Sequence, residues 1–224
     1  MERKIVRTAD GSTTIFLPDW DEHYHSKHGA LQEAYHVFIK QGLEEVSREA
    51  GKGLVSIMEI GFGTGLNAFI TLIEAAKKNL DIEYTGIEAY PVSSQEIKAL
   101  NYTETFTEKN AQKYFELLHE VAWDKEQVIT PFFKLHKKTQ FFHQIEAENT
   151  FDLIYFDAFG ARVQPELWTE EIFAIMFRAM KPGGILVTYS AKGSVRRAMQ
   201  AVGFMVERLP GPPGKREMLR ARKP

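Results

Sequence analysis

Three acidic residues stand at or near the ends of three apolar segments that have the composition of buried strands. These residues are Glu59, Glu88 and Asp157. In open α/β sheets, ligands bind outside the carboxyl ends of the strands, where such side chains converge. A carboxylate in this place can hold ribose hydroxyls, stabilise a developing cation or accept a proton. The pattern therefore predicts a site for a nucleotide-like cofactor.

A glycine-dense turn, EIGFGTGLN at residues 59–67, joins the first strand to a helical segment. Glycines let a ligand approach the backbone, and the start of a helix offers free N–H groups. A dinucleotide site would need its third glycine at position 66, but the residue there is Leu66. The acidic Glu59 is unfavourable beside a pyrophosphate and suits a cationic ligand. The expected cofactor contacts here are Glu59, Gly61, Gly63 and Gly65.

The E-x-G-x-G-x-G pattern resembles the first motif of class I S-adenosylmethionine-dependent methyltransferases, whose cofactor is a sulfonium. A dinucleotide site, or a glycine turn without a ligand, is the alternative. Glu88 ends the segment Asp81–Glu88 (DIEYTGIE) and is the candidate partner for both ribose hydroxyls. The other interpretation of Glu88 is a solvated carboxylate at a strand end.

Asp157 closes the segment FDLIYFD and would face the transferring methyl group. An amine that attacks this methyl must first be neutral and becomes cationic in the transition state. A carboxylate stabilises that charge and can accept the proton. Phe159 could stack on a flat substrate. The alternative interpretation makes Asp157 a turn cap and Phe159 a core residue.

The elements that position these residues alternate between strand and helix patterns. This order predicts an α/β fold of the class I methyltransferase (Rossmann-like) type, with a mostly parallel sheet, helices on both faces and a C-terminal antiparallel hairpin. The predicted strands are Leu54–Ile60, Ile82–Glu88, Phe132–His136, Phe151–Asp157, Gly184–Ser190 and the hairpin pair Phe204–Leu209 and Glu217–Arg222. The predicted helices are Thr64–Lys78, Phe106–Trp123, Glu170–Met180 and Ser194–Ala201, the last with Ser194 as its N-cap.

The composition of the chain limits its possible size class, location and chemistry. With 224 residues, 44% of them hydrophobic and 26% charged, the chain supports one sizeable core. No apolar run has the length of a membrane span and the N-terminus lacks a signal sequence, so we expect a soluble, cytoplasmic protein with no membrane partner. Zero cysteine excludes disulfides and thiolate metal sites. It also removes the nucleophile needed to methylate a pyrimidine ring carbon.

The net charge of −2 conceals an asymmetry. Residues 181–224 contain ten Lys and Arg against two Glu, a net +8, so the first 180 residues carry −10. This end of the molecule could dock a polyanion. A solvated basic tail is the equally simple alternative. The basic residues are Lys181, Lys192, Arg196, Arg197, Arg208, Lys215, Arg216, Arg220, Arg222 and Lys223.

Further motifs resemble the methyltransferase domain of the MnmC tRNA-modifying enzymes over nearly the whole chain. In the C-terminal half they are Asp157-Ala158-Phe159, Pro165–Trp168, Lys181–Gly184, Ala191–Arg197, Gly203-Phe204 and Lys215–Met218. In the N-terminal half they are Asp10-Gly11-Ser12, Asp21, Tyr24, Gly29, Glu33, Phe38 and the glycine turn through Asn67.

The resemblance implies methyl transfer from S-adenosylmethionine to the amine of 5-aminomethyl-(2-thio)uridine at the tRNA wobble position, with S-adenosylhomocysteine as product. It implies Asn67, Tyr24 and Glu33 as further cofactor contacts, the last two in a lid, and Arg196, Arg197, Lys215 and Arg216 as substrate or tRNA contacts. We expect a stand-alone, monomeric form without FAD or a metal. Residues 1–53 are expected to form an N-terminal extension or lid, and residues 54–224 the methyltransferase domain.

Two segments depart from the family pattern. Lys137-Lys138-Thr139-Gln140 stands where the family has Gly-Asp, so a carboxylate for the adenine is missing, and Gln140 or the backbone would replace it. Asp157-Ala158-Phe159-Gly160 stands where the family usually has Asp-Gly-Phe-Ala-Pro.

Other functions remain as alternatives. An aminopropyltransferase of the spermidine synthase type, or another small-amine transferase, would share the fold and the acidic strand ends. A nicotinamide-dependent reductase is the next alternative, and an inactive RNA-binding module is the last. The three histidines of HYHSKH, residues 23–28, suggest a metal site, but a polar loop is the simpler interpretation.

Overall fold

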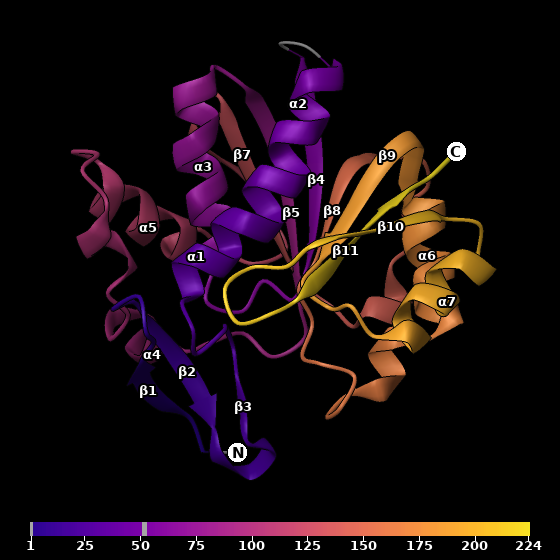
Figure 1. Ribbon diagram of the computed structural model, residues 1–224. Coiled ribbons are helices and arrows are strands. Elements are labelled where there is room, and N and C mark those ends of the chain that lie inside the picture. Colours follow the sequence, from indigo (N-terminus) through magenta and orange to yellow (C-terminus); the bar gives the residue numbers. More distant parts are fainter. Residues whose placement is uncertain (1, 51–52) are drawn as a thin grey trace.

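The computed structural model describes residues 2–50 and 53–224, and its main feature is an eight-stranded sheet (Figure 1). The strands are β4 (Leu54–Ile60), β5 (Asp81–Glu88), β6 (Glu126–Thr130), β7 (Phe133–Thr139), β8 (Phe151–Phe156), β9 (Met180–Thr188), β10 (Met205–Pro210) and β11 (Glu217–Arg222). Their order in the sheet is β10-β11-β9-β8-β4-β5-β7-β6.

The five central strands run parallel. β4 pairs with β5 and β8, and β7 and β9 continue the parallel sheet outward. From Val55 to Ile60 every residue of β4 is buried, because both faces of the sheet are covered. β10 and β11 form an antiparallel hairpin at one edge. The predicted α/β class, with its mostly parallel sheet and C-terminal hairpin, is confirmed.

Helices cover both faces of the sheet, as predicted. One face carries α1 (Ala30–Ala34), a π-helical stretch (Tyr35–Leu43), α2 (Glu44–Ala50), α3 (Leu66–Lys78) and α5 (Ala111–Glu120). α6 (Glu170–Ala179) and α7 (Gly193–Ala201) cover the other face (Figure 1). The short α4 (Ser94–Lys98) lies in the connection that follows β5.

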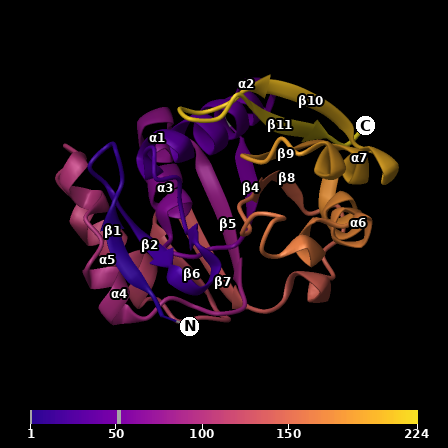
Figure 2. The ribbon, with the colours of Figure 1, turned by 60° about the horizontal axis from the view of Figure 1, so that its bottom comes forward.

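A second, three-stranded sheet lies beyond the carboxyl ends of the central strands (Figures 1 and 2). It consists of β1 (Lys4–Arg7), β2 (Thr13–Leu17) and β3 (Glu22–His23). The helical run from residue 30 to 46, in contrast, packs into the core of the large sheet. The domain boundary expected after residue 53 stays a prediction.

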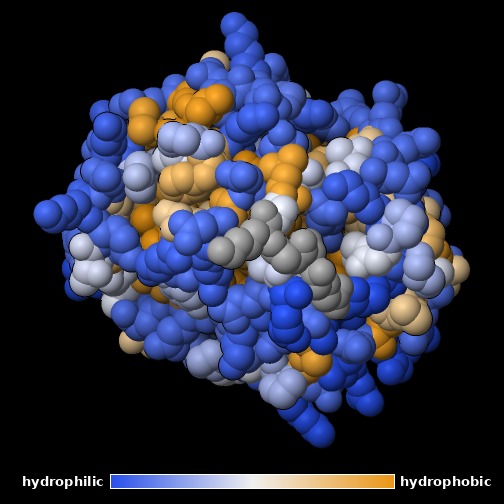
Figure 3. Space-filling model, turned by 90° about the horizontal axis from the view of Figure 1, so that it is seen from above, coloured by the Kyte–Doolittle hydropathy of each residue, from blue (hydrophilic) through white to orange (hydrophobic). Residues whose placement is uncertain are grey.

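The opposite end of the molecule, at the amino ends of the central strands, exposes mainly hydrophilic side chains with scattered apolar ones (Figure 3). Such a mixture is ordinary for a protein surface. In the described part of the chain, no helix has the length and apolar character needed to cross a membrane.

Several predicted boundaries differ from the structure. α5 begins at Ala111 because Phe106 is extended, and it stops before Val121, which is also extended. β9 begins at Met180, so it includes the Lys-Pro-Gly-Gly segment. Ser194 is not an N-cap: the cap residue is Lys192, and no side chain caps this helix. The edge strand β6 and the small sheet were not predicted.

One glycine of the central sheet is required by packing. A Cβ on Gly86 of β5 would lie 2.3 Å from Cδ2 of Phe62, and real contacts are never so short. Phe62 is buried and packs edge-on against Trp123 at 5.7 Å between ring centroids. Its ring therefore anchors the glycine turn on the sheet.

We predict that Gly86→Ala lowers the free energy of unfolding by about 1–3 kcal/mol, because the methyl group forces the Phe62 ring from its place. Urea unfolding followed by circular dichroism measures this. Gly193→Ala is the control, since only the flexible end of Arg197 lies near its Cβ, and a change within about 0.5 kcal/mol is expected. Equal effects in the two variants would contradict the packing argument.

Candidate functional site

A cavity of about 1360 Å³ opens between the carboxyl ends of the central strands and the small N-terminal sheet. Eight of the predicted site residues line it: Tyr24, Glu33, Gly61, Gly63, Glu88, Asp157, Phe159 and Lys215. Three more, Glu59, Gly65 and Asn67, are not on its wall, and Arg196, Arg197 and Arg216 lie outside it. The structure therefore brings together residues from both ends of the chain.

The glycine turn forms one wall of the cavity. Gly61, Gly63 and Gly65 all have positive φ, at 87°, 50° and 71°. The backbone N–H of Gly61 donates to the carbonyl oxygen of Ile87 at 3.0 Å, which ties the turn to the end of β5. A Cβ on Gly61 would lie 2.7 Å from the carbonyl oxygen of Asp157. Side chains are therefore excluded here, and the backbone itself faces the cavity.

Glu88 sits at the end of β5 and points back to this turn. Its Oε2 accepts the N–H of Gly63 at 3.1 Å, and its Oε1 accepts the N–H of Tyr90 at 2.9 Å. Each carboxylate oxygen keeps a second lone pair for a further donor. The carboxylate is thus fixed at the cavity wall with acceptor capacity for the two hydroxyls of a ribose.

Glu59 lies behind the wall rather than on it. Its side chain is buried, its Oε1 accepts the Asn67 amide at 2.8 Å, and its Oε2 lies 2.9 Å from the hydroxyl of Tyr84. Burial raises the pKa of Glu59 well above its usual range, and the neighbouring Asp157 adds to this. The structure therefore gives Glu59 no direct access to a ligand in the cavity.

Asn67 links this buried acid to the acid on the cavity floor. Its Nδ2 donates to Glu59 Oε1 and to Asp157 Oδ2, both at 2.8 Å. Its Oδ1 has no partner among the described residues. Both N–H groups of the amide are used by the two carboxyls, so the Asp157 side chain has a fixed position.

The Asp157 carboxyl titrates far from its ordinary range. Its pKa is raised to about 7, mainly by burial and also by the charge of Glu33, while the Asn67 hydrogen bond and the charge of Lys215 lower it. The carboxyl nevertheless faces the cavity. Such a group exchanges a proton near neutral pH, as a general base must.

Aromatic rings close the side of the cavity formed by the small sheet. The Phe159 ring contacts Tyr24 and Trp20 edge-on, at 5.0 Å and 5.6 Å between ring centroids. Tyr24 also approaches the glycine turn, since a Cβ on Gly63 would lie 3.2 Å from its Cδ1. Flat apolar surfaces therefore face the acidic floor.

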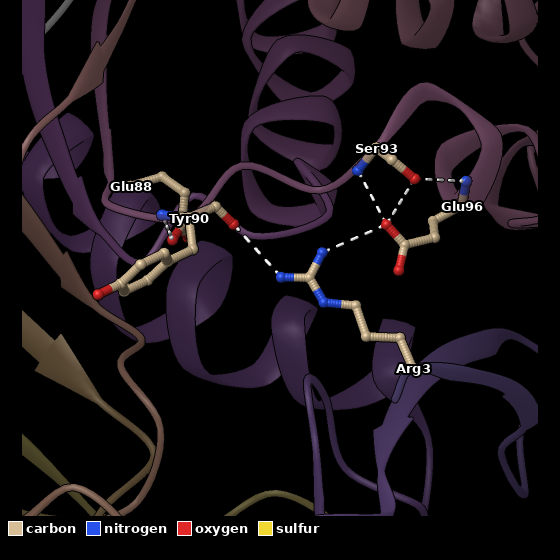
Figure 4. A network of polar contacts seen from close by, with 5 residues as sticks. All are labelled: Arg3, Glu88, Tyr90, Ser93 and Glu96. Atoms are coloured by element: carbon tan, nitrogen blue, oxygen red, sulfur yellow. Dashed lines mark hydrogen bonds and ion pairs between the residues drawn. The ribbon is translucent and has the colours of Figure 1, made fainter. Parts of the chain in front are cut away.

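Arg3 connects the small sheet to the loop after β5, which sequence reasoning missed (Figure 4). Its Nη1 lies 3.2 Å from Glu96 Oε2, and its Nη2 donates to the Tyr90 carbonyl at 3.5 Å. Its guanidinium lies 5.8 Å from the Tyr24 ring centroid. The only readable signal was Ser93-x-x-Glu96, which forms a capping box.

The structure does not support Gln140 as a contact for the adenine of the cofactor. Gln140 does not line the cavity, whereas Phe141, Phe142 and His143 do. Lys137 is turned into the protein, where its Nζ donates to the His119 carbonyl at 3.0 Å. Burial lowers the pKa of Lys137 to about 8. The aromatic side chains that follow Gln140 in the sequence, rather than Gln140 itself, thus line this part of the cavity.

The basic C-terminal residues are mostly paired within the protein. Lys181, Arg208, Lys215 and Arg220 form ion pairs with carboxylates. Among the described side chains, Lys192, Arg196, Arg197 and Arg216 form none. Arg222 and Lys223 donate hydrogen bonds to backbone carbonyls instead. The four residues without an ion pair are therefore the candidates for an open basic surface.

The histidines of residues 23–28 have separate neighbours. The ring of His23 stacks near Phe16 at 4.6 Å, and His25 Nε2 shares a hydrogen bond with Thr64 Oγ1 at 2.8 Å. Burial lowers the pKa of His25 to about 4, so its ring is neutral at pH 7. No group of three or more potential metal ligands occurs in the part of the chain that the structure describes.

The sequence profile of a family described as S-adenosyl-L-methionine-dependent methyltransferase matches residues 104–224, more than half of the chain. The chain belongs to this family. The predicted enzyme class is therefore confirmed, and the family favours S-adenosylmethionine over a dinucleotide at the glycine turn.

Curated relatives confirm the resemblance to MnmC. A protein of Paracidovorax citrulli named "tRNA 5-methylaminomethyl-2-thiouridine biosynthesis bifunctional protein MnmC" is 30% identical over 232 residues, covering 99% of this chain and 35% of that protein. One of the same name from Ectopseudomonas mendocina is 29% identical over 237 residues, covering 90% and 34%. The chain thus spans about a third of the length of these relatives.

Solved structures support the same family and fold. The crystal structure of MNMC2 from Aquifex aeolicus is 25% identical, with a TM-score of 0.83 over 100% of this chain and 71% of that one. Spermidine synthase from Thermotoga maritima is 14% identical, with a TM-score of 0.51 over 99% and 73%. The second likeness concerns the fold alone.

We predict that Gly63→Val abolishes binding of S-adenosylhomocysteine, because φ is positive there and a side chain meets the Tyr24 ring. Glu88→Ala should weaken binding by about 1–3 kcal/mol, the loss of charge-assisted hydrogen bonds. Calorimetry measures both. Glu83→Ala is the control, because Glu83 lies on the same strand and pairs with Lys134 away from the cavity. Wild-type affinity in both test variants would remove these residues from the cofactor site.

Proposed function

We propose that this protein transfers a methyl group from S-adenosylmethionine to the amine of 5-aminomethyl-(2-thio)uridine in tRNA. The observation that carries the proposal is the Asp157 carboxyl, with its pKa near 7, on the floor of a cavity between the glycine turn and an aromatic wall. The similarity to MnmC proteins over 90–99% of the chain supports the substrate class.

The cavity suits the proposed cofactor. Gly61 and Gly63 present bare backbone, Glu88 has acceptor capacity for a ribose, and Tyr24 closes the space above the turn. When bound, S-adenosylmethionine supplies a sulfonium methyl: the amine lone pair forms the new N–C bond while the C–S pair returns to sulfur. No residue of the chain needs to carry the methyl group.

Asp157 is the proton acceptor in this reaction. It receives the proton that the amine loses, and its negative charge stabilises the positive charge that grows on nitrogen. Asn67 keeps the carboxyl aimed at the reacting nitrogen through its 2.8 Å hydrogen bond. Glu59 acts through Asn67, since it fixes the other N–H of the same amide. Phe159 offers a face for the uracil ring.

The tRNA would meet four basic residues of the C-terminal segment that form no ion pair within the described part of the chain. Lys192, Arg196 and Arg197 lie at the start of α7, and Arg216 lies in the loop between β10 and β11. Phosphate contacts of this kind position a nucleic acid without reading its sequence. The smaller number of open cations makes the docking surface narrower than the net +8 suggested.

Methylation of a defined tRNA tests the proposal. The protein is incubated with S-adenosylmethionine and a tRNA that carries 5-aminomethyluridine, and the nucleosides are analysed by mass spectrometry. We expect a gain of one methyl group on the aminomethyl nitrogen. Transfer from decarboxylated S-adenosylmethionine to a diamine, without tRNA methylation, would instead indicate an aminopropyltransferase.

We predict that Asp157→Asn lowers single-turnover methylation by roughly two to four orders of magnitude, because the amide accepts no proton. Affinity for S-adenosylhomocysteine should change little, since the Asn oxygen can still accept the Asn67 hydrogen bond. Full activity in this variant would make Asp157 a structural residue.

The dependence of kcat/KM on pH follows from the titration of Asp157. The carboxylate form of Asp157 is the active one and its pKa is about 7. Below pH 7 this group should therefore add a fall in kcat/KM of about tenfold per pH unit to the more gradual pH dependence that comes from protonation of the substrate amine. Initial rates between pH 5.5 and 9 measure this limb. The limb should vanish in Asp157→Asn, and its persistence there would assign it to another group.

For the basic surface, we predict that Arg196→Ala, Arg197→Ala and Arg216→Ala together weaken tRNA binding and flatten its salt dependence. Each lost phosphate contact lowers the slope by about 0.7–0.9. Filter binding at several salt concentrations is the measurement. Arg208→Ala is the control, because Arg208 pairs with Glu217. A slope that stays at the wild-type value in the triple variant would make these cations a solvated face.

A further inference from the structure

Lys215 is the one basic motif residue that enters the cavity, and it does so beside two acids. Its Nζ pairs with Glu33 Oε2 and lies 3.9 Å from the ring centroid of Tyr189. Glu33 comes from α1 and is 7% exposed. The pair thus joins the C-terminal hairpin to the first helix across the cavity wall.

The loop that carries Lys215 is tightly folded. The N–H of Lys215 donates to the carbonyl of Pro212 at 2.9 Å, and that of Gly211 donates to the carbonyl of Arg216 at 3.1 Å. A Cβ on Gly211 would lie 2.4 Å from the Lys215 carbonyl oxygen. His36 Nε2 is 2.8 Å from the Pro210 carbonyl. The backbone of Lys215 is therefore held in place before any ligand binds.

The two charges of the pair act on Asp157 with opposite sign. The carboxylate of Glu33 raises the pKa of Asp157, and the ammonium of Lys215 lowers it. Glu59, behind Asn67, has its own pKa raised by burial and by Asp157. The titratable and charged groups that interact with the Asp157 carboxyl are Glu33, Lys215, Glu59, Tyr189, Tyr84 and Tyr102.

We propose that Lys215 neutralises Glu33, so that Asp157 and the acceptor nitrogen meet as a carboxylate and a neutral amine near pH 7. The proposal rests on the proposed function and deepens it. Lys215 is a positioning residue in this scheme, because it acts through Glu33 and does not touch the reacting atoms.

The physical reason lies in how neighbouring groups titrate. Two uncompensated carboxylates beside one amine would hold its ammonium form and would also hold a proton on Asp157. Both of those forms are inactive, since the nitrogen needs its lone pair and Asp157 must be free to accept one proton. Lys215 removes one of the two negative charges, so the single proton lost by the nitrogen has a single acceptor.

Direct titration of Asp157 tests the proposal. The carboxyl carbon of Asp157 is followed by 13C NMR in the full chain with S-adenosylhomocysteine bound, using Asp157→Asn to assign its signal. Lys215→Met should raise the apparent pKa of Asp157 by about one unit, and Glu33→Gln should lower it. The double variant should return close to the wild-type value. Lys40→Met, an exposed lysine outside the cavity, is the control and should leave the titration unchanged.

The double variant distinguishes charge compensation from a general loss of structure. A double variant shifted as far as Lys215→Met alone would overturn the proposal, because no charge would then have been compensated. So would an unshifted titration in Lys215→Met, whether accompanied by weaker cofactor binding or by a lower tRNA salt slope. Those two results would make Lys215 a cofactor or phosphate contact.

Kinetics provide the second readout. The rising limb of kcat/KM should move to higher pH in Lys215→Met, so that methylation falls about fivefold at pH 7 and recovers near pH 9. The titration of Asp157 needs no tRNA. Absence of methylation in the wild-type protein would therefore reject the proposed function while leaving the charge relation between these three residues measurable.

Discussion

The Asn67 amide between two carboxyls is the contact on which the site depends. Glu59 in β4 and Asp157, the residue after the neighbouring strand β8, approach the same amide nitrogen, each at 2.8 Å. Two ionised acids so close together would repel each other strongly in a buried place. The raised pKa of Glu59 and the donated N–H groups allow both to occupy the carboxyl ends of the strands. Of these two acids, only Asp157 lines the cavity.

Around this point the cavity is built from segments that are distant in sequence. The carboxyl ends of the large sheet supply Glu88, Asp157 and Phe159, the segment around β3 supplies Trp20 and Tyr24, and the loop of the C-terminal hairpin supplies Lys215. Arg3 fixes the small sheet to the loop that follows Glu88 (Figure 4). The α/β core thus forms the floor of the cavity. The small N-terminal sheet and the C-terminal hairpin determine the volume and the polarity of the cavity above this floor.

The sequence predicted the core well because its signals are local. Buried parallel strands appear as short apolar runs, and the glycine turn has a fixed spacing, so β4, β5 and the positions of Gly61 and Glu88 could be assigned. The edge strand β6 lacks such a run, since it exposes Val128 to 67%. Pairings such as Arg3 with Glu96 or Lys215 with Glu33 depend on tertiary structure and leave no local pattern. For the same reason the basic C-terminal residues looked like one surface although most of them are paired internally.

The assembly of the cavity from residues 3 to 215 has a consequence for biosynthesis. The parallel core can form once β9 has emerged from the ribosome, but the wall that carries Lys215 belongs to a hairpin synthesised later. Contacts between such distant segments close large loops and form slowly. A nascent chain that already holds its sheet would therefore still lack a finished acceptor pocket, and competence for chemistry would appear as a late, separate event in folding.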